Sequence, residues 1–112
     1  MKRIRCIIRP MKLDEVKISL TEIGVTGMTV TDVRGCGRQR GHRETFGGKS
    51  YTIDLPTKVK IEIVARDAEV DEIVETVLQH ARTGDHGDGK IFVMPMDDAA
   101  RIRTQERGDL VL

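Results

Sequence analysis

Apolar and polar residues alternate with a period of two in several short stretches, and this pattern predicts β-strands. In the first stretch Ile4, Cys6 and Ile8 share one face, and Pro10 follows the strand. Other stretches either alternate in the same way or are rich in β-branched residues. The predicted strands cover residues 2–9, 28–34, 58–65 and 91–94.

Two stretches between these strands have the 3.6-residue period of an amphipathic helix. In the first, apolar residues recur at Leu13, Val16, Leu20 and Ile23, and Gly24 is placed to end the helix. Asp67 is the predicted N-cap of the second helix. The apolar stripe of that helix consists of Val70, Ile73, Val74, Val77, Leu78 and Ala81.

The predicted order is therefore β-α-β, a long loop, and β-α-β again. This order predicts an α+β fold of the ferredoxin-like βαββαβ type, with a four-stranded antiparallel sheet and two helices on one face. We expect residues 1–112 to form a single domain that ends in a C-terminal segment of about residues 96–112. The uncovered face of the sheet predicts self-association into a closed cyclic oligomer.

Residues 35–58, GCGRQRGHRETFGGKSYTIDLPTK, show neither period. We expect no regular element in the middle of this stretch. A structureless connection of roughly 20 residues is uncommon in a compact domain, unless it is functional or disordered.

Composition removes several classes of function. The formal net charge of +1 gives no electrostatic case for nucleic acid or a membrane surface. No apolar run approaches the ~18 residues that span a bilayer, and no signal peptide follows Met1, so we expect a cytoplasmic protein without membrane insertion. Cys6 and Cys36 are expected to be reduced. The three histidines lack metal-ligand spacing, which argues against a protein zinc site.

Three polar clusters could carry chemistry, and each has an ordinary structural alternative. The clusters are residues 35–39, 87–90 and 101–103. The first offers glycines, a guanidinium and an amide, or is a flexible turn. The second could cradle phosphate with consecutive N–H groups and Lys90, or is a simple turn. In the third, alternation would place Arg101 and Arg103 on one side for phosphate, or the segment is a solvated edge strand.

No activated nucleophile is visible, so the sequence favours a binding protein over an enzyme. A small phosphate-ester hydrolase on the same fold is a remaining alternative.

Together these residues resemble the PII family of nitrogen-regulatory signal proteins over nearly the whole chain. The resemblance is carried by KLDEVKISLTEIGVTGMTV, GRQRGH, Tyr51 before a hydrophobic pair, KVKIEIV, ARTG, GDGKIFV and RIRT. It implies a homotrimer that binds ATP or ADP between subunits and carries a T-loop, about residues 37–55, between the second and third strands.

The resemblance also implies roles for individual residues. The implied nucleotide site consists of Thr29, Gly37, Arg38, Gln39, Val64, Gly87, Asp88, Gly89, Lys90, Arg101 and Arg103. Gln39 would hold a Mg²⁺ shared by ATP and 2-oxoglutarate, and Lys58 and Gly87 would contact that keto acid. Tyr51 would be the residue modified by a nucleotidyl transferase, through uridylylation or adenylylation.

The implied function is non-enzymatic regulation, through the T-loop, of an ammonium transporter or an enzyme of nitrogen metabolism. Four residues of the long stretch depart from the family pattern: Cys36, Phe46, Gly47 and Lys49. Two of them, Cys36 and Gly47, leave room for an alternative, a PII-like regulator that binds a nucleotide or another anion without sensing 2-oxoglutarate and has a different partner.

Overall fold

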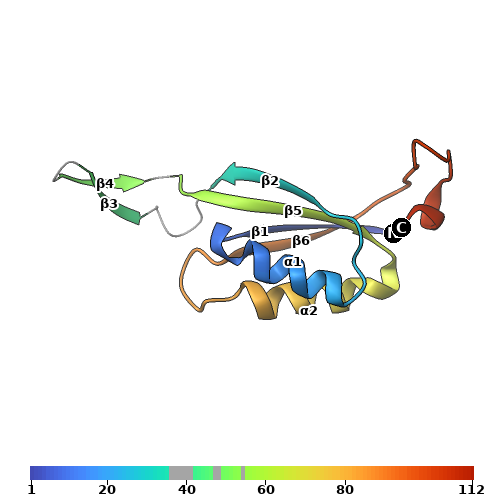
Figure 1. Ribbon diagram of the computed structural model, residues 1–112, viewed down its shortest axis with the longest axis horizontal. Coiled ribbons are helices and arrows are strands. Elements are labelled where there is room, and N and C mark those ends of the chain that lie inside the picture. Colours follow the sequence, from blue (N-terminus) through green and yellow to red (C-terminus); the bar gives the residue numbers. More distant parts are fainter. Residues whose placement is uncertain (36–41, 47–48, 54) are drawn as a thin grey trace.

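The structure is a computed structural model that describes residues 1–35, 42–46, 49–53 and 55–112, with side chains for residues 1–35 and 55–112 (Figure 1). Its six strands are β1 (Lys2–Ile8), β2 (Thr29–Arg34), β3 (His42–Phe46), β4 (Lys49–Ile53), β5 (Thr57–Ala65) and β6 (Gly89–Pro95). The α-helices are α1 (Leu13–Glu22) and α2 (Val70–Ala81). Short 3-10 turns cover Pro10–Lys12, Asp67–Glu69 and Gly108–Val111.

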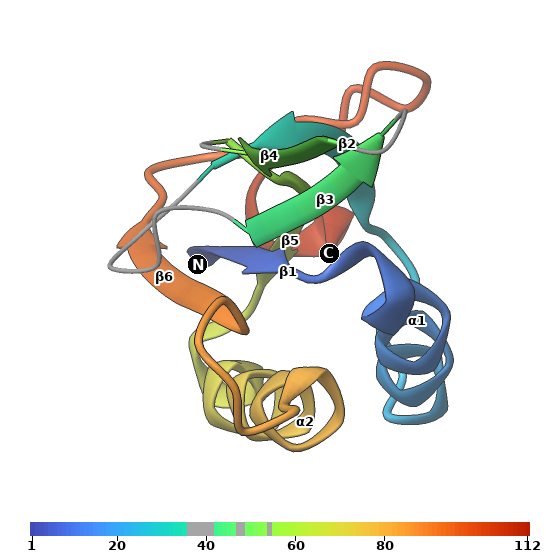
Figure 2. The same cartoon turned by 90° about the vertical axis from the view of Figure 1, so that its left-hand side faces the viewer.

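Four strands form one antiparallel sheet in the order β2-β5-β1-β6. Both helices cover the same face of this sheet, and Figure 2 shows them side by side beneath it. This arrangement confirms the predicted ferredoxin-like fold. Within the part of the chain that the structure describes, no helix is long and apolar enough to cross a membrane.

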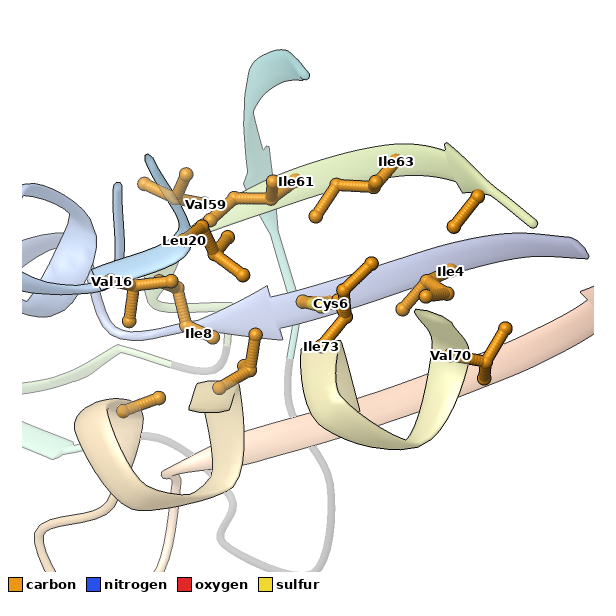
Figure 3. Close-up of a cluster of buried hydrophobic side chains, with 13 residues drawn as sticks. Ile4, Cys6, Ile8, Val16, Leu20, Val59, Ile61, Ile63, Val70 and Ile73 are labelled. Carbon is orange, nitrogen blue, oxygen red and sulfur yellow. The ribbon is translucent and has the colours of Figure 1, made fainter. Parts of the chain in front are cut away.

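The core lies between the sheet and the helices (Figure 3). The alternation of β1 places Ile4, Cys6 and Ile8 in this layer, all at most 1% exposed. Cys6 lies opposite Ile61 of β5 and Ile91 of β6, so three neighbouring strands contribute one row of apolar side chains. Burial raises the pKa of the Cys6 thiol to about 11, which keeps it protonated and unreactive at neutral pH.

Both helices form with the predicted period, but Leu78 of the predicted apolar stripe is 50% exposed and lies outside the core. The start of α2 also differs from the prediction. Asp67 is not its N-cap: a 3-10 turn over Asp67–Glu69 precedes the helix, and no side chain caps it. The Asp67 carboxylate instead accepts a hydrogen bond from the Met1 amino group at 2.7 Å. The end of α1 follows the prediction, because Gly24 adopts φ +96° and its N–H donates to Thr21.

The prediction of no regular element within residues 35–58 is wrong in part, because β3 and β4 form a separate two-stranded antiparallel sheet. Phe46 pairs with Lys49, so two residues connect the strands, and in the sequence these are glycines. A Gly-Gly pair between β-favouring residues is a recognised hairpin signal. The hairpin extends away from the four-stranded sheet in Figure 1.

Core packing predicts a contrast between two isoleucines. Ile61→Ala should lower the free energy of unfolding by about 2–5 kcal/mol, because it leaves a cavity in a fully buried layer. Ile18→Ala should change it by less than about 1 kcal/mol, since Ile18 is 59% exposed on α1 and alanine favours helix. Urea unfolding at one protein concentration measures both, and equal losses would contradict the assignment of the core.

Candidate ligand site

The turn between α2 and β6, residues 82–88, is organised by the carboxylate of Asp88. Its oxygens accept hydrogen bonds from the main-chain N–H groups of Thr83 at 2.9 Å and Gly84 at 2.8 Å, and from the Thr83 hydroxyl. Arg9, just beyond the end of β1, donates its Nε–H to the same carboxylate at 3.0 Å. Arg9 also donates to the main-chain oxygen of His86 at 2.7 Å, so one guanidinium holds the turn at two points.

These contacts fix the charge of Asp88. Burial opposes ionisation, but hydrogen bonds from Thr83, Gly84 and Arg9 outweigh it and hold the pKa of Asp88 well below its usual range. The carboxylate is therefore ionised at neutral pH. Its oxygens serve the turn itself, whereas the sequence predicted Asp88 only as a residue lining the nucleotide site.

Lys58, near the start of β5, lies against the same turn. Lys58 is 8% exposed, and its ammonium donates a hydrogen bond to the main-chain oxygen of Gly87. Burial and the nearby positive charge of Arg9 lower the pKa of Lys58, while Asp88 acts in the opposite direction. Lys58 and Gly87, the two residues predicted to contact a keto acid through the resemblance, are thus in direct contact.

Gly89 allows the turn to join β6 because its Cα lies against the backbone of β1. A Cβ built at Gly89 would lie 1.6 Å from the main-chain oxygen of Ile7, and φ is +106°. Only glycine accommodates both conditions. Lys90, the next residue, pairs with Ile7 on the face of the sheet opposite the helices and is exposed.

Thr29 and Val64 line a pocket of about 720 Å³ near the other end of the sheet. The pairing of β2 with β5 places Thr29 opposite Glu62, which also lines this pocket. Arg3 at the start of β1 and Val111 near the C-terminus also line this pocket. Polar and apolar groups therefore surround one cavity beside Thr29 and Val64, the two residues predicted to lie near adenine.

Arg101 and Arg103 lie in a tight turn, and not in the alternating strand that their spacing suggested. Ala100 forms an isolated bridge with Arg107, and the Gln105 N–H donates to the main-chain oxygen of Arg101 at 2.8 Å. Ile102 is 97% exposed, so no face of a strand is buried here. The Arg101 guanidinium donates to Glu106 Oε1 at 2.8 Å.

The predicted site residues thus fall into two groups at opposite ends of the sheet (Figure 1). Lys58 and Val64 are six residues apart on β5, which corresponds to about 20 Å in an extended strand. Gly37, Arg38 and Gln39 lie outside the described residues. Tyr51 is in β4, where the structure describes the backbone only.

Two residues of this site were missed from the sequence. Arg9 contacts Asp88 across 79 residues of chain. Glu62 occupies a polar position of the third predicted strand. The register of β2 and β5 could have indicated Glu62 as a site residue, because this register places Glu62 opposite Thr29. No local sequence pattern indicates a role for Arg9. Among the described residues, no cluster of three or more His, Cys, Asp or Glu side chains is arranged to hold a metal ion.

The close approach at Gly89 predicts a severe effect of a single methyl group. Gly89→Ala should lower the free energy of unfolding by more than about 2 kcal/mol, because the Cβ collides with β1 and the backbone is strained. Gly27→Ala is the control, since its Cβ would meet nothing within 4 Å. Thermal or urea unfolding distinguishes them, and a Gly89→Ala protein as stable as Gly27→Ala would exclude this close approach.

The lowered pKa of Asp88 predicts a pH-dependent contribution to stability. Asp88→Asn should destabilise the protein by about 2 kcal/mol at pH 7, because the turn loses charge-assisted hydrogen bonds. The contribution of Asp88 is fully present above its unfolded-state pKa of about 3.9 and is lost as pH falls through the lower folded-state pKa. Urea titrations should therefore show a constant difference from wild type between pH 7 and 5 that narrows at pH 3. A difference that grows on acidification would contradict the sign.

Comparison with known proteins agrees with these observations. Residues 1–106 match the family described as "Nitrogen regulatory protein P-II". A protein of that name from Rhodospirillum rubrum is 55% identical over 108 residues, which cover 96% of each chain. "Nitrogen regulatory protein P-II 2" from Methanothermobacter thermautotrophicus is 56% identical over 108 residues, covering 96% of this chain and 94% of that protein. The "Nitrogen regulatory protein P-II" from Klebsiella oxytoca is 52% identical over 112 residues and all of both chains. With this fold and this similarity along its length, the chain belongs to the P-II family.

Proposed function

We propose that this chain is a signal-transduction protein of nitrogen metabolism that binds ATP or ADP between subunits and, with Mg-ATP, 2-oxoglutarate. The observation that carries the proposal is the environment of Lys58. Lys58 is buried beside a second cation, Arg9, while the nearby carboxylate of Asp88 is engaged by Arg9 and the turn. An anionic ligand at Lys58 would supply the negative charge that this environment favours.

A homotrimer would bring the two groups of site residues together. The group around Lys58 and the group around Val64 are separated by the length of β5, so a ligand reaching both types of residue requires a second copy of the chain. The uncovered face of the sheet supports such association, since Phe92 of β6 is 47% exposed there. In this arrangement the pocket of one subunit, beside Thr29, receives adenine, and the phosphates extend from Arg101 at the edge of that pocket to the turn of the neighbouring subunit.

Gln39 completes the proposal through the family resemblance, as the residue that would hold Mg²⁺ shared by ATP and 2-oxoglutarate. The metal would neutralise phosphate charge and fix the keto acid. The buried ammonium of Lys58 beside the main-chain oxygen of Gly87 fits a ligand carboxylate. Gly37 and Arg38 would extend the same anion site.

Regulation would run through the T-loop. The hairpin of β3 and β4 extends away from the sheet, where a partner such as an ammonium transporter or an enzyme of nitrogen metabolism can reach it. A ligand can change partner affinity only by binding two loop arrangements with different affinity. Nucleotidylylation of Tyr51 in β4 would act on the same hairpin.

Calorimetry tests the assignment of effectors. The wild-type protein should bind 2-oxoglutarate only when Mg-ATP is present. Lys58→Ala should weaken that binding at least tenfold, because it removes a charge-assisted hydrogen bond worth about 1.5–3 kcal/mol. Lys17→Ala on the exposed face of α1 is the control for loss of one positive charge and should bind normally.

Unchanged 2-oxoglutarate binding in both Lys58→Ala and Gln39→Ala would show that the roles are wrongly assigned. ATP binding without 2-oxoglutarate binding under any condition would favour the alternative, a P-II-like nucleotide-binding regulator that does not sense the keto acid.

A further inference from the structure

Arg101 already has an anionic partner within its own chain. Its Nη1 donates to Glu106 Oε1 at 2.8 Å, and both side chains are about two-fifths exposed. An arginine fork binds carboxylate and phosphate with the same N–H groups and similar planar geometry. Glu106 therefore occupies the part of Arg101 that a phosphate oxygen would use.

The position of Arg101 places this pair beside the pocket that contains Thr29 and Val64. Its Nη2 donates to the main-chain oxygen of Val111 at 3.4 Å, and Val111 lines that pocket. Arg66, which also lines the pocket, donates to the main-chain oxygens of Asp109 at 3.1 Å and Leu112 at 3.3 Å. The C-terminal segment therefore holds the Arg101–Glu106 pair at the edge of the cavity.

The pair is not needed to close the turn in which it lies. Main-chain hydrogen bonds join Arg101 N–H to the oxygen of Glu106 at 2.9 Å and Gly108 N–H to the oxygen of Ala99 at 2.9 Å. At the base of the turn, Arg107 Nε donates to Asp98 at 2.8 Å. Since the backbone and this second ion pair close the turn, the side-chain contact between Arg101 and Glu106 can break without opening it.

We propose that the Glu106 carboxylate competes with the phosphate groups of a bound nucleotide for the Arg101 guanidinium. This competition lowers the affinity of the protein for the nucleotide. This inference rests on the proposed nucleotide binding and adds to it a residue that lowers the affinity. A phosphate oxygen that binds Arg101 must displace the Glu106 carboxylate or share the guanidinium with it. The free protein thus keeps its arginine neutralised until a ligand with sufficient negative charge arrives.

The test compares ATP affinity in matched variants by calorimetry. Glu106→Gln should lower the Kd for ATP about two- to fivefold, which is the range that an exposed ion pair supplies. Asp97→Asn is the matched control, because it removes one negative charge from an exposed residue of the same C-terminal segment and leaves both ion pairs of the turn intact. It should leave the Kd within about twofold of the wild-type value.

Two further measurements separate competition from a general loosening of the pocket. In an Arg101→Ala background, Glu106→Gln should no longer improve ATP binding, because the contested group is gone. Adenosine, which lacks phosphates, should bind the wild type and Glu106→Gln equally. Improved adenosine binding, or an equal gain in the Arg101→Ala background, would overturn the proposal.

Failure of this inference can be distinguished from failure of the proposed function. If the wild type binds ATP and Glu106→Gln binds it no more tightly, only the competition is excluded. If the wild type and Glu106→Gln both fail to bind ATP, nucleotide binding itself is excluded, and the competition with it.

Discussion

The central position of β1 is the constraint on which the rest of the structure depends. Every residue from Lys2 to Ile8 pairs on one side with β5 and on the other with β6. This double pairing fixes the register of three strands, and a shift by one residue would move Ile4 and Cys6 out of the core. The two ends of β1 also reach both groups of predicted site residues, since Arg3 lines the pocket and Arg9 holds the turn before β6.

Much of this fold could be predicted from the sequence, because the spacing of apolar residues along most of its helices and strands follows the face that is buried. The stripes of α1 and, except for Leu78, of α2 follow a buried face, as does the alternation of β1 and β5, so local pattern and tertiary packing agree. The errors lie in two other segments. β3 and β4 pair with each other in a separate two-stranded sheet, and at residues 101–103 the chain turns although the residues alternate. Asp67 likewise has the residue type of an N-cap but is used in an ion pair with Met1.

Prediction of the site was limited in a different way. The resemblance implies the roles of Lys58, Gly87, Thr29 and Val64, and the fold brings these residues together in two pairs. Strand register explains the second pair. Arg9 could not be found by the same reasoning, because its contact with Asp88 depends on how a turn 79 residues away folds back onto β1. The role of Asp88 differs from the predicted one for the same reason. Only the folded turn shows that its carboxylate oxygens accept hydrogen bonds from Thr83, Gly84 and Arg9.

Each group of predicted site residues lies beside an arginine that is paired with a carboxylate of the same chain. Arg9 is paired with Asp88 in the turn before β6, and Arg101 is paired with Glu106 in the C-terminal turn. Each internal carboxylate lowers the free energy of an arginine in the unliganded protein and so weakens the attraction for stray anions. The two carboxylates differ in how firmly they are held, since Asp88 also bonds to Thr83 and Gly84 whereas the Glu106 pair is largely exposed. In the proposed site, an incoming polyanion would therefore displace Glu106 far more readily than Asp88. The C-terminal turn would then be the adjustable end of that site, and the turn before β6 its fixed end.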